Sequence, residues 1–339
     1  MTALTVPVSL HPVAWHRLAW VVWRRYRTTL IAVLALLAVL GSYLVVTGRR
    51  MRTAYSSLEA CTPAHSAACQ FRWNDFHNTY GGGGLISVVL VLLPGLVGAF
   101  AGAPLLAREL ESGTFRYAWT QGVGRMRWAV ATVVPGLVGL AVVMALMGTL
   151  VSWHHTPLVD AGITPRFEGS AFPVTGLAIV GWAVLGFALA LLAGLLWRRV
   201  VPALATAFAV WFGLAYVASR VRLHYEAPLT TTSLRLGGRQ LSIGQWWDKN
   251  GVRVDDAQVN QVLQAIGVQQ HGSGTFTARP GNGTVDPVQY LVQHGYTQVT
   301  SYQPDSRYWP FQWIELGWLA ALSIAMVALT LWLLRRRAA

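Results

Sequence analysis

Six long apolar segments constrain the fold of this 339-residue chain more than any other feature of its sequence. They are Leu30–Val46, Leu85–Leu106, Trp128–Val151, Val174–Trp197, Val200–Ala218 and Trp313–Leu334. At a rise of about 1.5 Å per residue, an apolar helix of roughly 20 residues crosses the hydrocarbon layer of a membrane. Because the backbone inside lipid must satisfy its own hydrogen bonds, we expect all of these segments to be helices. The sequence predicts an all-α integral membrane protein with six transmembrane helices.

The distribution of arginine predicts the orientation of these helices. About half of the 26 Lys and Arg residues lie in the N-terminal segment, the loop after the second run, the turn Arg198-Arg199 and the tail Arg335-Arg336-Arg337. Short loops rich in Arg stay in the cytoplasm, whereas long loops are translocated largely regardless of charge. We therefore expect a multi-pass protein of the plasma membrane with both termini in the cytoplasm.

The formal net charge of +13 follows from this topology and from contact with anionic lipid headgroups. Nucleic acid is not an expected partner, because no basic stripe is interleaved with base-stacking aromatic residues.

The prediction divides the chain into four parts. Residues 1–27 form a cytoplasmic N-terminus, in which Pro12–Arg27 is predicted as a helix lying in the membrane interface. The alternative is that this stretch is the frayed start of the first span. Residues 28–219 hold the first five spans with a cytoplasmic loop over 107–127, residues 220–311 form an extracellular domain, and residues 312–339 hold the sixth span and a basic tail.

The region between the fifth and sixth spans is predicted to be a small mixed α/β domain. It alternates turn residues with short strand-like runs. Apolar residues at helical spacing, Val259, Val262, Leu263 and Ile266, predict a helix within 255–266 with Asp255 or Asp256 as its N-cap. A second short helix is predicted over Pro287–His294, preceded by Asp286.

Two cysteines, Cys61 and Cys69, lie in the first predicted outer loop, Gly48–Gly84. Two cysteines close together in an exported loop fit a small disulfide, and two free thiols are the alternative. The second outer loop, Ser152–Phe172, carries His154, His155 and Asp160. The spacing of these three residues is generic and lacks the His-Glu-x-x-His pattern, so no metal site is predicted.

The predicted spans hold no acidic or basic residue away from their ends, which argues against an ion-coupled transporter or an intramembrane enzyme. The chain also lacks a phosphate-binding G-x-x-x-x-G-K-[ST] loop, so ATP must be used by a partner if it is used at all. Gly95, Gly98 and Gly102 in the second run permit close approach of a neighbouring helix, or are ordinary features of membrane helices.

The loop after the second span is the best candidate for a protein-docking feature. It carries Glu109 and Glu111, which are the acids on the predicted cytoplasmic side. A short helix is predicted over 114–121, N-capped by Ser112 or Thr114. Exposed aromatic residues beside Arg116 would suit a protein interface, and the alternative is a solvated loop with its aromatic rings among the lipid headgroups.

Two stretches resemble a known family. Residues 102–121, GAPLLARELESGTFRYAWTQ, resemble the signature of actinobacterial ABC-2 type transporter permeases, in which an acidic stretch ending in Gly-Thr follows the second span and leads into Trp-Thr-Gln. Residues 302–315, YQPDSRYWPFQWIE, resemble a second stretch of that family at the start of the last span. The loop between the fifth and sixth spans is the least matched part.

The resemblance implies the transmembrane permease subunit of an ABC exporter. Such a subunit is not an enzyme and binds no cofactor, since ATP and Mg are held by a separate cytosolic ATP-binding subunit present in two copies. It works with a second permease copy, expected to be identical, surrounded by membrane lipid. The interfacial helix of the family maps onto Pro12–Arg27 and its cysteine pair onto Cys61 and Cys69. The expected ATPase-coupling residues are Arg108, Glu109, Glu111, Gly113, Thr114, Phe115, Arg116 and Trp119.

The expected cargo is a hydrophobic or amphipathic compound, such as a drug, a natural product or a lipid-like molecule, because the passage would be lined by apolar residues. Two other classes remain open. One is a ligand-sensing or assembly protein that acts through its extracellular domain without transport. The other is a membrane-embedded enzyme acting on lipid or peptidoglycan precursors, which would use His154, His155, Asp160, Asp255 or Asp256.

Overall fold

The computed structural model describes residues 15–62, 66–112, 125–233, 239–271, 275–278 and 286–336. The chain forms two compact units. The helical unit consists of residues 1–157, 170–218 and 312–339, and the α/β unit consists of residues 158–169 and 219–311.

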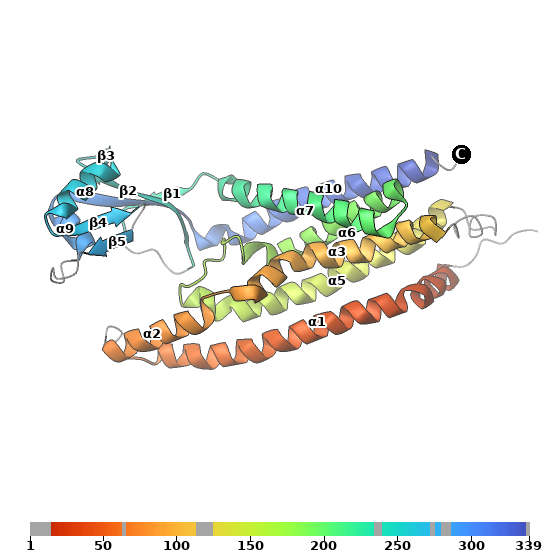
Figure 1. Cartoon of the computed structure of the whole chain (residues 1–339), viewed down its shortest axis with the longest axis horizontal. Helices are drawn as coiled ribbons and strands as arrows, with labels where there is room; N and C mark the ends of the chain where they lie inside the picture. The colour runs from red at the N-terminus through yellow and green to blue at the C-terminus, as the bar shows by residue number, and fades with distance from the viewer. Residues whose placement is uncertain are drawn as a thin grey trace, which may run out of the picture. The chain divides into compact units, whose positions relative to one another are not determined.

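The helical unit is built from long helices that run side by side in Figure 1. They are α1 (Trp15–Glu59), α2 (Ala67–Tyr80), α3 (Gly84–Ser112), α5 (Arg125–Asp160), α6 (Ala178–Trp197), α7 (Val200–Val221) and α10 (Tyr308–Arg336). Six helices of the described chain, all of these except α2, are long and apolar enough to cross a membrane. The predicted set of six membrane-spanning helices is therefore confirmed, and the start of α1 lies at the same end of the unit as the end of α10 (Figure 1).

The first helix is longer than the sequence analysis predicted. It runs without interruption from Trp15 to Glu59, a length of 45 residues. The separate interfacial helix predicted over Pro12–Arg27 is not confirmed, because its described part forms the first turns of α1 and residues 1–14 lie outside the described residues. No Gly or Pro stands between Trp15 and Leu30 to interrupt the helix.

Helix α6 forms the core of the helical unit. In its most apolar stretch 72% of the residues are buried inside the protein, against 11% in α1 and 17% in both α7 and α10. Ile179, Ala183, Phe187 and Leu191 of α6 belong to the main hydrophobic cluster. The outward faces of α1, α7 and α10 carry exposed apolar side chains, as expected of helices that meet lipid.

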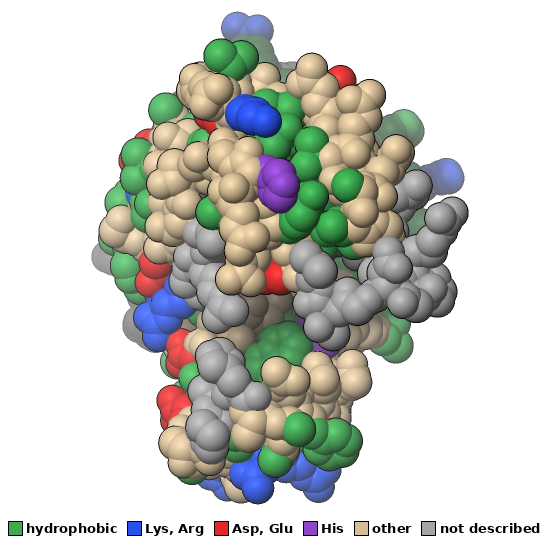
Figure 2. Space-filling model, turned by 90° about the vertical axis from the view of Figure 1, so that its left-hand side faces the viewer, with side chains coloured by type: hydrophobic (Ala, Val, Ile, Leu, Met, Phe, Trp, Pro, Cys, Tyr) green, Lys and Arg blue, Asp and Glu red, His purple; other side chains and the backbone are tan. Residues whose placement is uncertain are grey.

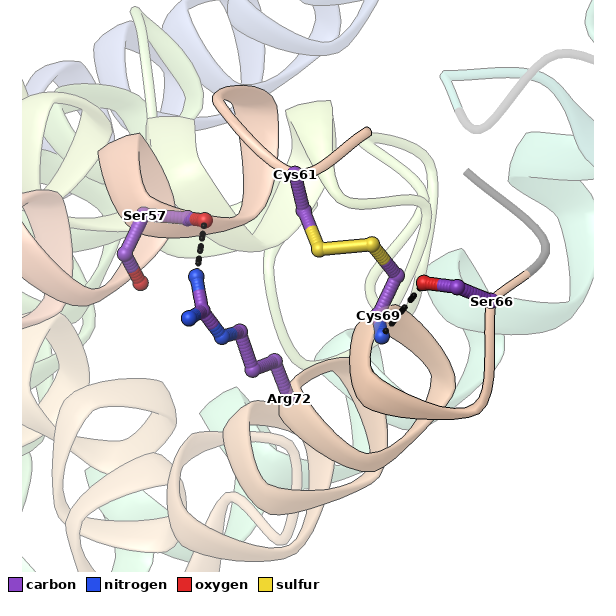
Figure 3. Close-up of a disulfide and its surroundings, with 5 residues drawn as sticks. All are labelled: Ser57, Cys61, Ser66, Cys69 and Arg72. Carbon is purple, nitrogen blue, oxygen red and sulfur yellow. Dashed lines mark hydrogen bonds between the residues drawn. A yellow bond between two sulfur atoms is a disulfide. The ribbon is translucent and has the colours of Figure 1, made fainter. Parts of the chain in front are cut away.

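A disulfide joins the end of α1 to α2. Cys61 and Cys69 are bonded, with their Cα atoms 5.8 Å apart, as the spacing predicted. Ser66 caps α2 by accepting a hydrogen bond from the Cys69 amide at 3.3 Å, and Arg72 donates to the Ser57 carbonyl at 3.4 Å (Figure 3). Cross-linking this hairpin restricts the unfolded chain and so stabilises the folded arrangement.

The α/β unit contains an antiparallel sheet in the order β1-β6-β2-β3 and a separate hairpin of β4 and β5. Its strands are β1 (Leu229–Thr231), β2 (Leu241–Lys249), β3 (Val252–Val254), β4 (Val268–His271), β5 (Thr275–Ala278) and β6 (Tyr296–Gln303). Asn250 and Gly251 join β2 to β3 with positive φ angles of 53° and 79°. An Asn-Gly pair suits this two-residue hairpin turn, since both residues tolerate a left-handed backbone.

Two short helices complete the α/β unit and cover its core. They are α8 (Asp256–Gln264) and α9 (Pro287–Gln293), which lie within the predicted helical segments. Asp286 caps α9 by accepting from the Val288 amide at 3.0 Å. Trp247 of β2, Val259 and Leu263 of α8 and Leu291 of α9 are buried together in a small hydrophobic cluster.

The predicted outer loop Ser152–Phe172 is partly helical. Helix α5 continues to Asp160, so His154 and His155 lie on a helix rather than in a loop, and a short 3-10 helix (η1, Phe172–Val174) precedes α6.

The face shown in Figure 2 carries acidic and basic side chains among apolar ones. This mixed surface contrasts with the apolar outward faces of α1 and α7.

Candidate coupling site

The structure describes three of the eight predicted coupling residues. Gly113, Thr114, Phe115, Arg116 and Trp119 lie outside the described residues, together with the short helix predicted over 114–121. Arg108, Glu109 and Glu111 lie on the last turns of α3. The side chains of Arg108 and Glu111 are exposed to solvent, which leaves them accessible to a partner.

Glu111 links the end of α3 to the start of α7. Its carboxylate oxygen Oε2 accepts a hydrogen bond from the Val200 amide at 3.3 Å. A carboxylate at a helix N-terminus is favourable by about 0.3–1 kcal/mol, because it meets unpaired amides and the positive end of the helix dipole. The neighbouring turn holds Arg198, with a left-handed φ of 53°, and Arg199, both exposed. The candidate site therefore includes two of the short arginine-rich segments.

Helices α3 and α6 pack with their backbones in contact. A Cβ atom on Gly98 would overlap the carbonyl oxygen of Ala183, and one on Gly102 would overlap the carbonyl oxygen of Phe187. On the facing helix, a Cβ on Gly186 would lie 3.1 Å from the Gly95 carbonyl oxygen. Small residues allow membrane helices to approach this closely.

The same contact continues toward the ends of the two helices at Arg108 of α3 and Trp197 of α6. A Cβ on Gly194 would lie 3.2 Å from the Ala103 carbonyl oxygen and 3.3 Å from the Ala107 amide nitrogen. The interface thus extends from the middle of α3 almost to Arg108. Because the two backbones are in contact at these glycines, we expect a displacement of the end of α3 to be transmitted to α6.

A second set of contacts holds the opposite end of α6. The Gln312 side chain of α10 accepts hydrogen bonds through Oε1 from the Leu177 and Ala178 amides, at 2.9 and 2.7 Å. Its Nε2 donates to the Phe172 carbonyl at 3.3 Å. Gln312 is completely buried, so α10 supplies the polar partner for the first turn of α6.

Glu315 lies one turn further along α10 and is also completely buried. Its Oε1 accepts a hydrogen bond from Trp182 Nε1 at 2.7 Å, and the Trp182 carbonyl accepts one from Trp211 Nε1 of α7 at 3.0 Å. The sequence analysis placed Glu315 at the edge of the last span, two residues after Trp313. In the structure α10 begins earlier, at Tyr308, so Glu315 lies within the helix.

His154, His155 and Asp160 are not brought together as metal ligands. His154 Nε2 lies 3.1 Å from Thr47 Oγ1 of α1, and His155 Nδ1 lies 3.0 Å from the Val151 carbonyl oxygen. Asp160 accepts from Arg239 at 2.6 Å. Within the described part of the chain, no group of three or more His, Cys, Asp or Glu residues is placed to hold a metal ion.

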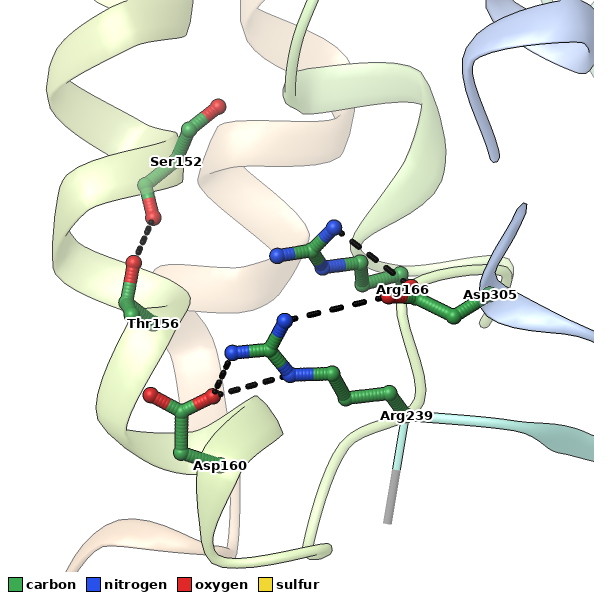
Figure 4. A network of polar contacts seen from close by, with 6 residues as sticks. All are labelled: Ser152, Thr156, Asp160, Arg166, Arg239 and Asp305. Carbon is green, nitrogen blue, oxygen red and sulfur yellow. Dashed lines mark hydrogen bonds and ion pairs between the residues drawn. The ribbon is translucent and has the colours of Figure 1, made fainter. Parts of the chain in front are cut away.

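The α/β unit contains an ion-pair network around Asp305 (Figure 4). Arg166 and Arg239 reach the Asp305 carboxylate at 3.4 and 3.8 Å. The hydrogen bonds that Arg239 donates to the Asp160 carboxylate, and then the negative charge of that carboxylate, raise the pKa of Arg239. In the same figure, the Thr156 hydroxyl donates to the Ser152 carbonyl within α5. Because the network is partly exposed, each pair contributes little to stability.

Two residues of the stretch 302–315, just before α10, contact the segment that follows α7. Gln303 Nε2 donates to the carbonyls of Leu223 and Glu226, at 3.1 and 2.9 Å. Arg307 pairs with the Glu226 carboxylate at 2.7 Å and donates to the Ala227 carbonyl. The segment that leaves α7 is thereby joined to the segment that enters α10.

The sequence analysis missed the partners of α6. Gly98 and Gly102 form a G-x-x-x-G pattern, and Gly186, Ala190 and Gly194 repeat small residues at the same spacing on α6. This pattern could have predicted that the two helices pair. Gln312 and Glu315 lie in the stretch that resembles the family, but their partners belong to α6, which is distant in the sequence.

A sequence model of the ABC-2 membrane transporter related family matches residues 34–222. The match covers more than half of the chain and includes α3, the end of α3 that carries Glu111, and α6. Neither a curated protein nor a solved structure is significantly similar to the chain. The chain belongs to the ABC-2 membrane transporter related family.

Proposed function

We propose that this protein is the transmembrane permease subunit of an ATP-driven ABC-2 type exporter. Family membership supports a transport permease and, in general, a cytosolic ATP-binding partner. The observation that carries the proposal is the glycine interface between α3 and α6, because it gives the exposed end of α3 a rigid connection to the core of the helical unit. The chain itself binds no ATP or Mg, which are held by the partner.

The mechanism begins at the cytoplasmic end of α3. Two ATP-binding subunits dock on the 108–121 segments of two identical permease copies and move them when they close around ATP. Helix α6 follows α3, since their backbones are in contact. The start of α7 also moves with the end of α3, because the Val200 amide donates a hydrogen bond to Glu111. The result is a change in the passage between the two permease copies.

The expected cargo is hydrophobic or amphipathic and leaves the cell. The exposed faces of the spanning helices are apolar, so a passage between two copies would favour such a molecule over an ion or a sugar. The common end of α1 and α10 carries basic residues, including the exposed Arg24 and Arg336, which supports cytoplasmic termini in the plasma membrane. The α/β unit then lies outside the cell.

Replacing Glu109 and Glu111 by glutamine tests the coupling role. We expect the double variant E109Q/E111Q to assemble with the ATP-binding subunit but to lose about tenfold in transport-coupled ATP turnover, as for a contact worth ~1.4 kcal/mol in the active state. Turnover is measured on the purified complex in lipid. E59Q is the matched control, because Glu59 is an exposed acid at the other end of the helical unit. Equal turnover in the wild type and E109Q/E111Q would contradict the role.

A further inference from the structure

Gln312 and Glu315 hold the end of α6 that lies opposite the glycine interface. They are one turn apart on α10 and both are fully buried against α6. A buried polar side chain in a membrane helix is costly unless it is hydrogen-bonded, and it usually has a function. We call these two residues, with Trp182, the outer latch.

The first half of the latch is an N-cap supplied by another helix. The first amides of a helix have no partner within it, and Leu177 at the N-cap position of α6 provides no side-chain cap. Gln312 accepts from the Leu177 and Ala178 amides instead. Because the acceptor belongs to α10, these two bonds persist only while α6 and α10 keep their relative position.

The second half of the latch reaches a third helix. Glu315 accepts from the Trp182 indole, and the Trp182 carbonyl accepts from the Trp211 indole of α7. The rings of Trp211 and Trp318 meet the Trp182 ring edge-on, each at 5.5 Å between centroids. The Trp182 side chain is therefore fixed on several sides, and its bond to Glu315 is directional.

Helix α6 thus has two different attachments along its length. Residues 183–194 contact α3 through the backbone, and residues 177–182 contact α10 through hydrogen bonds. If α3 moves α6, the outer end of α6 must either carry α10 or break these bonds. Three hydrogen bonds at 2.7–2.9 Å, all to side chains of α10 that are fully buried, favour the first outcome.

We propose that Gln312 and Glu315 are positioning residues that transmit the movement of α6 to α10. The proposal rests on the proposed function, since it assumes that an ATP-binding partner moves α3. ATP turnover rearranges the outer end of the last span while the latch is intact. Without the latch, ATP turnover continues but α10 no longer follows.

The test measures helix movement and needs no cargo. Spin labels are placed on V46C with L85C, to report α1 against α3, and on V46C with W313C, to report α1 against α10. All three positions are exposed apolar residues of spanning helices, and the native cysteines are in the disulfide and do not react. Distances are compared with and without ATP and vanadate, on the complex with its ATP-binding subunit in lipid.

The latch is removed by the triple variant W182F/Q312L/E315L, which removes Glu315 together with its indole donor and so leaves no unpaired buried charge. E315Q keeps an oxygen acceptor for the Trp182 indole. S323A is the control, because Ser323 is a buried polar residue of α10 whose hydroxyl donates to the Leu319 carbonyl of its own helix.

In the wild type, E315Q and S323A, we expect both distances to shift by about 2–5 Å on trapping with vanadate. In W182F/Q312L/E315L the α1–α3 distance still shifts and ATP is still hydrolysed, but the shift of the α1–α10 distance is lost. An unchanged α1–α10 shift in this variant overturns the latch and leaves the proposed function intact. If the wild-type complex shows no α1–α3 shift, the proposed function fails and the latch fails with it.

Discussion

Replacing Gly98 or Gly102 by alanine is expected to destabilise the helical unit by about 1–3 kcal/mol, the usual cost of overpacking a tight interface. A Cβ at either position overlaps a backbone carbonyl of α6, at Ala183 or Phe187. A backbone atom cannot rotate away as a side chain can, so the helices must separate. The change also breaks the rigid connection through which the end of α3 moves α6.

Gly139 of α5 and Gly213 of α7 provide the controls. A Cβ at either position meets no atom within 4 Å. Alanine in an open helical position is more favourable than glycine by about 1 kcal/mol, so G139A and G213A should raise the unfolding temperature or leave it unchanged. Thermal unfolding of the four purified variants in one detergent measures the difference. A shift of the same sign and size in all four would contradict backbone contact between α3 and α6.

Replacing Trp247 by alanine is expected to unfold the α/β unit. Trp247 is 2% exposed and packs among Val259, Leu263 and Leu291. Removing a fully buried tryptophan costs about 3–5 kcal/mol. This cost is a large part of the stability of a small unit, whereas the helical unit, with its own core, should remain folded.

The neighbouring residue, Trp246, is the matched control. It lies on the opposite face of β2 and is half-buried, with the Arg253 guanidinium 5.0 Å from its ring centroid. W246A should cost about 1 kcal/mol or less. Limited proteolysis followed by mass spectrometry of the fragments measures the outcome. We expect rapid cleavage within 219–311 in W247A and slow cleavage in W246A and the wild type, and equal cleavage of both variants would refute this account of the core.

The membrane helices were predictable because lipid imposes a requirement that can be recognised in the sequence. An apolar run of sufficient length must be helical in lipid, so the six runs defined the six helices. Their ends were less predictable. Outside the hydrocarbon layer the length of the apolar run no longer sets the end of a helix, and α1 extends to Glu59 and α5 to Asp160.

Local signals also determined parts of the α/β unit. Periodic apolar residues predicted α8, and Asp286-Pro287 predicted the start of α9. The Asn250-Gly251 pair identifies the β2–β3 hairpin and could have been used in the same way. The pairing of β6 with both β1 and β2 joins residues far apart in the sequence, and no local pattern specifies it.

The candidate site was predictable at its exposed end only. Glu109 and Glu111 were predicted because they are the acids on the expected cytoplasmic side and because they lie in the stretch that resembles the family. The residues that connect this end to the rest of the protein are buried, and each depends on a partner helix. Glu315 illustrates the difference, because in the sequence it was one acid near a span end, and in the structure it accepts a hydrogen bond from Trp182 of α6.

The most direct test of the central claim is purification of the tagged protein from its native host in mild detergent, with an ATPase assay on the eluate. The account predicts that an ATP-binding subunit copurifies in equal amount and that the complex hydrolyses ATP in a vanadate-sensitive manner. A permease that purifies alone, without nucleotide turnover, would contradict it and would favour a ligand-sensing or assembly role for the α/β unit.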